Sequence, residues 1–143
     1  MVNITREEVR KSLQEDWATY PERLLALPPA EWKAFLHKQG YARLADLLGH
    51  VIAWWQDGMR MVNEMLQDPT RVNPDYDVDS FNARAIARFK DAREEEVMEE
   101  FEATRLAFLA LIERLPESAF DDPRITGRLY PETIGHMQEH KVE

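Results

Sequence analysis

Apolar residues recur at every third or fourth position along most of this chain, a period typical of amphipathic helices. The first helical run is expected to begin at the capping box Thr5–Glu8, where a hydroxyl and a carboxylate satisfy free amide hydrogens. The pair Pro28-Pro29 ends this run, because the residue before a proline is pushed out of the helical region. No segment shows sustained alternation of apolar and polar residues, so we expect little or no sheet. The stripe of the first run consists of Val9, Leu13, Trp17, Tyr20 and Leu24.

Residues 30–40 are expected to be a connector with room for one turn of helix. A second long helix is predicted over residues 42–67. The loop that follows, residues 68–79, is polar and contains Pro69 and Pro74. It is long for a bundle connection and favours a crossover over a tight hairpin. The core stripe of the second helix is Leu44, Leu47, Leu48, Val51, Trp55, Met59, Val62 and Met65.

The rest of the chain predicts two further helical regions. Ser80 is a suitable N-cap for a helix over residues 81–115, and a second capping box at Asp91–Glu94 divides that run into two possible pieces. Residues 116–130 are expected to be irregular, with Pro131 at the first position of a last helix. Four main helices in 143 residues predict an all-α single domain, 1–143. We expect an antiparallel four-helix bundle with a long crossover between helices two and three.

Charge and composition exclude several classes of function. The chain has 18 Lys and Arg against 27 Asp and Glu, a formal net charge of −9. This argues against nucleic acid or an anionic membrane surface as a partner, because both are bound through basic residues. Cysteine is absent, which excludes disulfides, thiolate zinc sites and cysteine nucleophiles. The longest apolar run, Leu106–Ile112, is far too short for a membrane span, and no signal peptide is visible, so we expect a cytoplasmic protein.

The few glycines and serines form none of the common phosphate-binding or nucleophile motifs, which leaves histidine, carboxylate, tyrosine and tryptophan for chemistry. His136 and His140 are four residues apart, so both imidazoles share one helix face. His50 flanks the core stripe of the second helix. Three imidazoles that converge can bind Zn²⁺, Ni²⁺, Cu²⁺ or Fe²⁺ and leave a position open for water or substrate. The plainer interpretation is two surface histidines and one hydrogen-bonded core histidine.

Other candidates carry weaker signals. A di-iron site requires Glu three residues before each histidine. The residues at those positions are Leu47, Thr133 and Met137, so we set that site aside. The acidic run of residues 94–102 is expected to be a solvated helix face, and His37 is expected to be exposed.

Two further residues follow His50 at helical spacing. Trp54 lies one turn on and could line a pocket beside a metal ion. Asp57, a further turn on, could orient a ligand or act as a base, although a plain surface charge is the commoner role.

Several segments resemble the DinB-like superfamily, in the right order and over most of the chain. The resemblance looks closest to the branch of self-resistance proteins related to ClbS and DfsB. It implies a four-helix bundle with one divalent ion, Zn, Ni or Fe, held by His50, His136 and His140. Characterised members of the superfamily include thiol-dependent transferases and isomerases, and dimers are common. The segments that carry the resemblance are Leu44–Trp55 (LADLLGHVIAWW), Ser80–Phe89 (SFNARAIARF), Glu95–Arg105, Leu115-Pro-Glu and Thr133–His140 (TIGHMQEH).

Three hypotheses follow. The first is a metal-dependent hydrolase or thiol S-transferase, whose partners are a small electrophilic molecule and a low-molecular-weight thiol. The second is a non-catalytic bundle without metal that sequesters a small molecule or confers self-resistance. The third is an interaction domain that forms a homodimer. The first predicts bound metal, the second predicts tryptophan fluorescence that a ligand quenches, and the third predicts the mass of a dimer.

Overall fold

The computed structural model describes residues 3–142, and all regular structure in that range is helical. The elements are α1 (Arg6–Lys11), a π-helical turn (Ser12–Asp16), α2 (Tyr20–Leu25), α3 (Pro29–Gln39), α4 (Leu44–Gln67), α5 (Val78–Phe89), α6 (Glu94–Arg114), a 3₁₀ turn (Glu117–Asp121), α7 (Pro123–Glu132) and α8 (Ile134–His140). The expectation of an all-α fold is confirmed.

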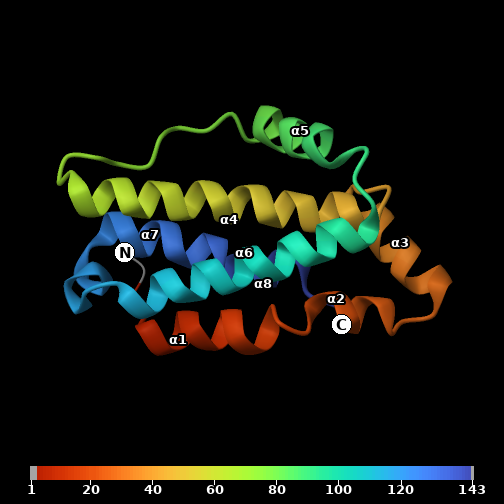
Figure 1. Cartoon of the computed structure of the whole chain (residues 1–143), viewed down its shortest axis with the longest axis horizontal. Helices are drawn as coiled ribbons and strands as arrows, with labels where there is room; N and C mark the ends of the chain where they lie inside the picture. The colour runs from red at the N-terminus through yellow and green to blue at the C-terminus, as the bar shows by residue number, and fades with distance from the viewer. Residues whose placement is uncertain (1–2, 143) are drawn as a thin grey trace.

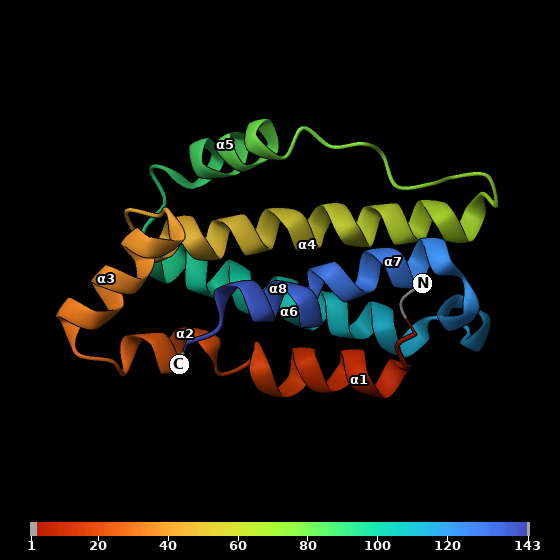
Figure 2. The ribbon, with the colours of Figure 1, turned by 180° about the vertical axis from the view of Figure 1, so that it is seen from behind.

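The long helices pack lengthwise, and α4 contacts α6, α5 and α7. In Figure 1, α4 and α6 run in the same direction, whereas α1 and the α7–α8 pair run in the opposite direction. The loop from the end of α4 returns along the outside of that helix to α5, as both Figure 1 and Figure 2 show. This long return connection allows α6 to run parallel to α4, and it leaves α5 outside the bundle.

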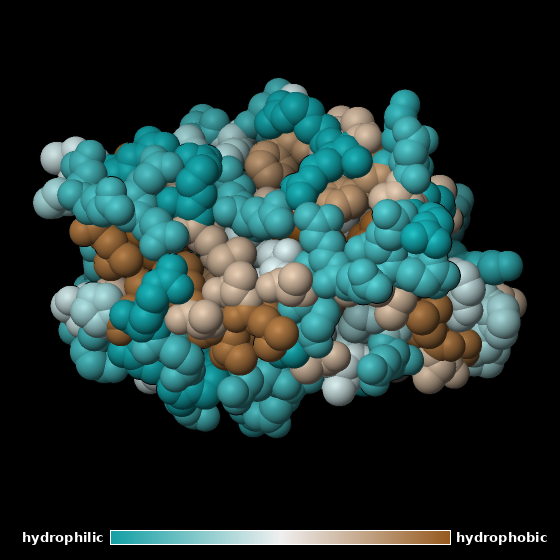
Figure 3. Space-filling view, in the orientation of Figure 1, coloured by the Kyte–Doolittle hydropathy of each residue, from teal (hydrophilic) through white to brown (hydrophobic). Residues whose placement is uncertain are grey.

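The apolar stripes predicted from the sequence form the core. Every residue of the first stripe is buried, from Val9 to Leu24. The stripe on α4 is buried as well, except for the half-buried Met59. Polar side chains cover most of the face in Figure 3, with apolar groups in patches between them. The exposed large apolar side chains are scattered over different elements: Leu66, Val72, Val78, Ile86 and Leu106.

The expected continuous first helix is wrong. It is interrupted after the π-helical turn, where the amide of Trp17 bonds the carbonyl of Ser12 at 3.0 Å. Pro21 lies at the start of α2 and explains the interruption. A proline inside a helix has no amide hydrogen, and its ring collides with the carbonyl four residues earlier, here that of Trp17.

Two segments that we expected to be largely irregular are helical. The connector of residues 30–40 is almost entirely α3, which begins at Pro29 and ends at Gly40 with φ +92°. Proline at the first position and glycine in the left-handed conformation after the last are ordinary helix boundaries. Within 116–130, α7 begins at Pro123 after the N-cap Asp122. Pro131 therefore lies near the end of α7, not at the start of the last helix.

The predicted division of residues 81–115 is confirmed, although the caps differ. Helix α5 begins earlier, because the side chain of Asp77, rather than Ser80, accepts the cap hydrogen bond. Helix α6 begins at Glu94 after Arg93, whose amide donates to the side chain of Glu96 at 3.0 Å. The acidic run on α6 is mostly exposed, and so is His37 on α3. No helix in residues 3–142 is long and apolar enough to cross a membrane.

Candidate metal centre

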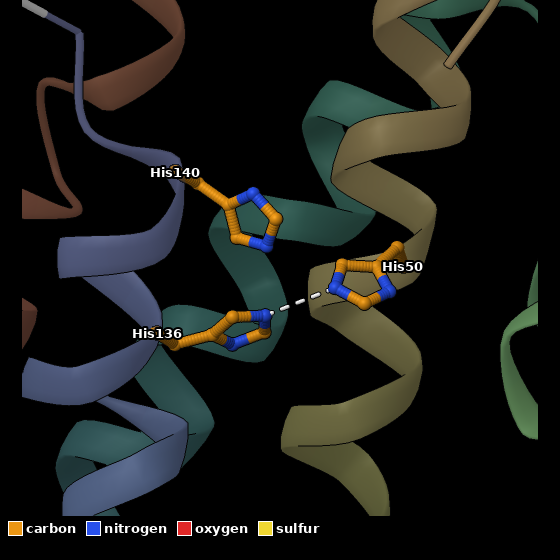
Figure 4. Close-up of side chains that lie close together, drawn as sticks. All are labelled: His50, His136 and His140. Atoms are coloured by element: carbon orange, nitrogen blue, oxygen red, sulfur yellow. Dashed lines mark hydrogen bonds between the residues drawn. The ribbon is translucent and has the colours of Figure 1, made fainter. Parts of the chain in front are cut away.

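Three imidazoles from two helices meet inside the bundle. His50 comes from α4, and His136 and His140 lie one turn apart on α8. All three side chains are buried, and one nitrogen from each lies within 4.8 Å of the others. Nε2 of His136 is 3.1 Å from Nε2 of His50. Figure 4 shows the three rings turned toward a common point. The structure thus brings together the three histidines that the sequence singled out.

A break in the chain sets the direction of α8. Helix α7 ends at Glu132 and α8 begins at Ile134, with Thr133 between them at φ −111° and ψ −79°. Pro131 has no amide hydrogen to donate to the preceding turn, which weakens the helix just before the break. The last helical segment can therefore take its own direction, with its two histidines facing α4.

Two buried indoles secure this break. Nε1 of Trp55 donates to the carbonyl of Glu132 at 2.7 Å, and Nε1 of Trp17 donates to the carbonyl of Thr133 at 3.0 Å. A buried carbonyl without a partner would cost free energy, so these bonds stabilise the broken path of the chain. The rings of Trp17 and Trp55 also pack edge to face, with centroids 5.1 Å apart. The aromatic core therefore positions the histidine-bearing helix.

The protonation of His50 is fixed by Asn82 on α5. Oδ1 of Asn82 lies 3.1 Å from Nδ1 of His50 and 2.8 Å from Nε1 of Trp54. An indole N–H can only donate, so the shared atom is an acceptor and Nδ1 of His50 carries its hydrogen. The lone pair of His50 is then on Nε2, which faces the other imidazoles. Helix α5 comes this close because it packs on Gly49, where a Cβ would lie 2.5 Å from the ring of Phe89.

His140 is held at both its backbone and its ring. The hydroxyl of Tyr20 donates to the carbonyl of His140 at 2.5 Å. Nδ1 of His140 lies 2.7 Å from Oε1 of Gln39, at the end of α3, and donates to it. Nε2 of His140 and Nδ1 of His136 are buried and have no hydrogen-bond partner among residues 3–142. Buried polar atoms are nearly always paired, so the unpaired Nε2 of His140 indicates a place for a ligand.

All three imidazoles are uncharged at neutral pH. Burial lowers the pKa of His50 to about 4, although the bond with Asn82 opposes this. Burial, helped by the proximity of His50, lowers the pKa of His140 to about 4. The pKa of His136 lies well below its ordinary value, through burial and then through its two neighbours. The neutral imidazole is the form that binds a metal ion.

The donor set fits a divalent metal ion. Three imidazole nitrogens around a tetrahedral zinc ion, each at its usual bond length, would be about 3.3 Å apart. The 3.1 Å separation of the His50 and His136 nitrogens is close to this value, and all three nitrogens lie within 4.8 Å of one another. Two side-chain amides fix the ring orientations, as outer partners of metal-binding histidines usually do. These residues could therefore hold one metal ion.

A cavity of about 300 Å³ opens beside the histidines. This volume is at the lower end of the range for small-molecule pockets. Trp54 contributes to the wall, and its indole stacks on Phe81 at a centroid distance of 3.9 Å. The residues that line the cavity are His50, Trp54, Val78, Asn82, Pro131, Glu132, His136 and Glu139.

Asp57 does not line this cavity. Its carboxylate accepts hydrogen bonds from Tyr76, from Arg60 at 2.7 Å and from Arg128 at 2.9 Å. Burial raises the pKa of Asp57, but these hydrogen bonds outweigh it and hold the pKa below its ordinary value. Asp57 was expected to act beside His50, but it instead forms an ion pair with Arg128 on α7.

Glu132 also lines the cavity, although the sequence pattern did not single it out. Its side chain is 7% exposed, and Oε2 lies 3.4 Å from Nη2 of Arg128. Burial raises the pKa of Glu132 to about 8, even though Arg128 acts in the opposite direction. The signal was present, because Glu132, His136 and His140 follow one another at intervals of four residues.

Asn82 and Gln39 were also missed as partners of the histidines. Asn82 lies within the segment SFNARAIARF, where nothing distinguishes it from an exposed helix residue. Gln39 lies at the end of a helix that was expected to be a connector. For these two residues the sequence contains no local signal.

Comparison with known proteins agrees with this arrangement. No curated protein and no solved structure matches the chain significantly. The family model of the DinB superfamily matches residues 12–142, which include all three histidines. A place in the ClbS- and DfsB-related branch stays a prediction from the sequence. The match covers nearly the whole chain, and the protein therefore belongs to the DinB superfamily.

Proposed function

We propose that the protein binds one divalent metal ion through His50, His136 and His140 and acts as a hydrolase or thiol S-transferase on a small electrophilic molecule. One observation carries the proposal: three buried imidazoles converge, and two of them, those of His50 and His136, line a cavity of about 300 Å³. Membership of the DinB superfamily supports it. Imidazole ligands suit zinc, nickel and iron alike, so the donor set leaves the metal open.

The chain's own residues would divide the work. His50, His136 and His140 would hold the ion, which supplies Lewis acidity to lower the pKa of a bound water or thiol and to polarise the electrophile. Three protein ligands would leave one position for water or substrate. Asn82 and Gln39 keep the rings of His50 and His140 oriented. The other cavity residues, with Trp54 foremost, would enclose the substrate.

Activity of stripped and reloaded protein tests this proposal. Untagged protein would be freed of metal with a chelator, reloaded with Zn²⁺, Ni²⁺ or Fe²⁺, and assayed with an activated ester and with a chloronitrobenzene plus cysteine. We expect at least one metal to restore turnover at least about tenfold above the stripped protein, the scale of losing one well-placed catalytic contact.

Two variants make the result specific. His136→Ala should stay at the stripped level with every metal. His37→Ala removes an exposed histidine from α3 and should behave as the wild type. Equal rates in stripped, reloaded and His136→Ala protein would contradict a metal-dependent reaction in this cavity.

A further inference from the structure

Glu132 contributes a carboxyl group to the cavity without belonging to the group of potential metal ligands. Its side chain is 7% exposed and lines the same cavity as His50 and His136. Among residues 3–142, the ligating atoms that gather within 4.8 Å of one another come from the three histidines alone. Glu132 therefore lines the cavity as a group separate from the three-histidine cluster.

Arg128, the cation next to Glu132, already makes shorter hydrogen bonds to other residues. Arg128 donates from Nη2 to Asp57 at 2.9 Å and from Nη1 to the hydroxyl of Tyr76 at 2.7 Å. Its contact with Glu132, at 3.4 Å, is the longest that Nη2 makes. In the part of the chain that the structure describes, Oε1 of Glu132 makes no hydrogen bond. This oxygen is not among the fully buried atoms without a partner, so it is accessible and can accept a hydrogen bond from a molecule in the cavity.

The fold makes room for this carboxyl group at some cost to the neighbouring helix. A Cβ on residue 58 of α4 would lie 2.8 Å from Oε2 of Glu132, so only Gly58 allows the side chain its place. Glycine inside a helix is less favourable than alanine by roughly 1 kcal/mol. The backbone of Glu132 is itself fixed by the bond from Trp55 to its carbonyl. The carboxyl group is thus held in position from two sides.

The charges along the cavity wall also favour a ligand with a cationic or hydrogen-bond-donating group. Within the described part of the chain, the lining includes two carboxyl side chains, those of Glu132 and the exposed Glu139, and no lysine or arginine. From this geometry we infer that the substrate carries a hydrogen-bond-donating or cationic group that binds Glu132, while another part of the molecule reaches the metal ion. The inference rests on the proposed function. It assigns Glu132 as a specificity-determining residue and disfavours substrates with a carboxylate at that end.

Three small thiols test this assignment, because they share the sulfur that binds metal and differ in the other end. Cysteamine ends in an ammonium group, 2-mercaptoethanol in a hydroxyl and 3-mercaptopropionate in a carboxylate. Each would be titrated into cobalt(II)-loaded protein without oxygen, with the sulfur-to-cobalt absorption band as the readout. The quantity of interest is the ratio of the Kd of mercaptopropionate to that of cysteamine.

In Glu132→Gln we expect this ratio to fall by about tenfold, the low end of what a hydrogen bond to a charged group contributes. The comparison of protein variants cancels the different acidities of the thiols. Gly58→Ala should lower the ratio too, because it displaces the carboxyl group, and it serves as a second variant if Glu132→Gln folds poorly. Glu99→Gln makes the same substitution at an exposed site on α6 and should leave the ratio unchanged.

The outcomes separate the two proposals. Absence of the cobalt ligand-field spectrum in the wild type would overturn the proposed function and this inference with it. A normal cobalt spectrum with the same ratio in wild type, Glu132→Gln and Gly58→Ala would overturn the role of Glu132 alone.

Discussion

Two polar clusters, one buried and one partly buried, contact the helix α4 and differ in how their hydrogen bonds are filled. The histidine cluster (His50, His136 and His140) is uncharged and contains ring nitrogens without partners. The Arg128 cluster (Asp57, Tyr76, Arg128 and Glu132) contains full charges, and Arg128 alone contacts each of the other three. In the first cluster the imidazole rings are oriented, but ring nitrogens remain without hydrogen-bond partners. In the second cluster almost every polar group bonds another group of the protein.

This difference indicates that the histidine cluster is a binding site, whereas the Arg128 cluster is a structural joint that holds neighbouring elements together. A closed network of partly buried charges fixes the elements that it connects, here α4, α7 and the 68–77 loop. Oriented but unpaired nitrogens fix nothing and cost free energy until a ligand fills them. Glu132 belongs to the Arg128 cluster and also lines the cavity beside the histidines, so it connects the two.

The largest expected effect is the loss of the cation from the closed cluster. Arg128→Met would remove one of three hydrogen-bond partners from Asp57, whose side chain is 14% exposed. Breaking a buried ion pair costs about 3–5 kcal/mol in the free energy of unfolding, and we expect about 3 kcal/mol here because Arg60 and Tyr76 remain. Urea denaturation would measure it. Arg60→Met removes the half-exposed partner of the same carboxylate and should cost about 1 kcal/mol or less. Equal, small losses in both variants would show that the Arg128 cluster is not the joint described.

Filling the open cluster should stabilise the protein. Free zinc at a hundredfold excess over its Kd should raise the free energy of unfolding by about 2.7 kcal/mol, because zinc would bind the folded state. Thermal melts with and without zinc would show this as a higher Tm. His136→Ala should lose the effect and His37→Ala should keep it. A zinc-dependent Tm that survives in His136→Ala would assign the metal to some other place.

The hydrogen bond that orients His50 can be removed without changing any of the three histidines. Asn82→Ala removes the acceptor of the Nδ1 hydrogen and should raise the Kd for zinc about 10- to 100-fold, as loss of such partners generally does. Asn82→Asp keeps an acceptor and should retain the affinity of the wild type. Competition with a chromophoric chelator would measure both. Equal affinities in wild type and Asn82→Ala would mean that packing alone orients the ring.

The smallest effect is on the pH dependence of the metal-free protein. His50 and His140 have a pKa of about 4 in the folded chain, below the 6.5 of a free imidazole. Between these values the unfolded state binds more protons, so stability falls as the pH decreases. From pH 6.5 to 5.5 each histidine should account for a loss of about 1 kcal/mol. His140→Gln should therefore have a shallower slope than His37→Gln in urea denaturation across this range. Identical slopes would contradict the shift.

The sequence predicted the histidine cluster better than the Arg128 cluster, for a physical reason. His136 and His140 follow helical spacing, and His50 flanks an apolar stripe, so periodicity alone indicates which way each points. Asp57 has the same spacing relative to His50. Its direction is decided by Arg128, 71 residues further on. A pairing of that kind depends on which helix packs beside which, and one sequence contains no record of it.

The missed helices α3 and α7 have a different cause. Both begin at a proline, which is common in loops and also at the first position of a helix, so the residue alone does not distinguish the two. The error hid Gln39, which α3 places against His140. It also moved Pro131 to the wrong side of the break that orients α8.

The most direct test of the account is the metal content of the purified protein. Untagged wild type and His136→Ala would be exposed to zinc or nickel at neutral pH, cleared of free metal and analysed for elements. We expect about one equivalent in the wild type and a loss of that equivalent in the variant. No metal in either protein would show that the three imidazoles are structural and would contradict the central claim.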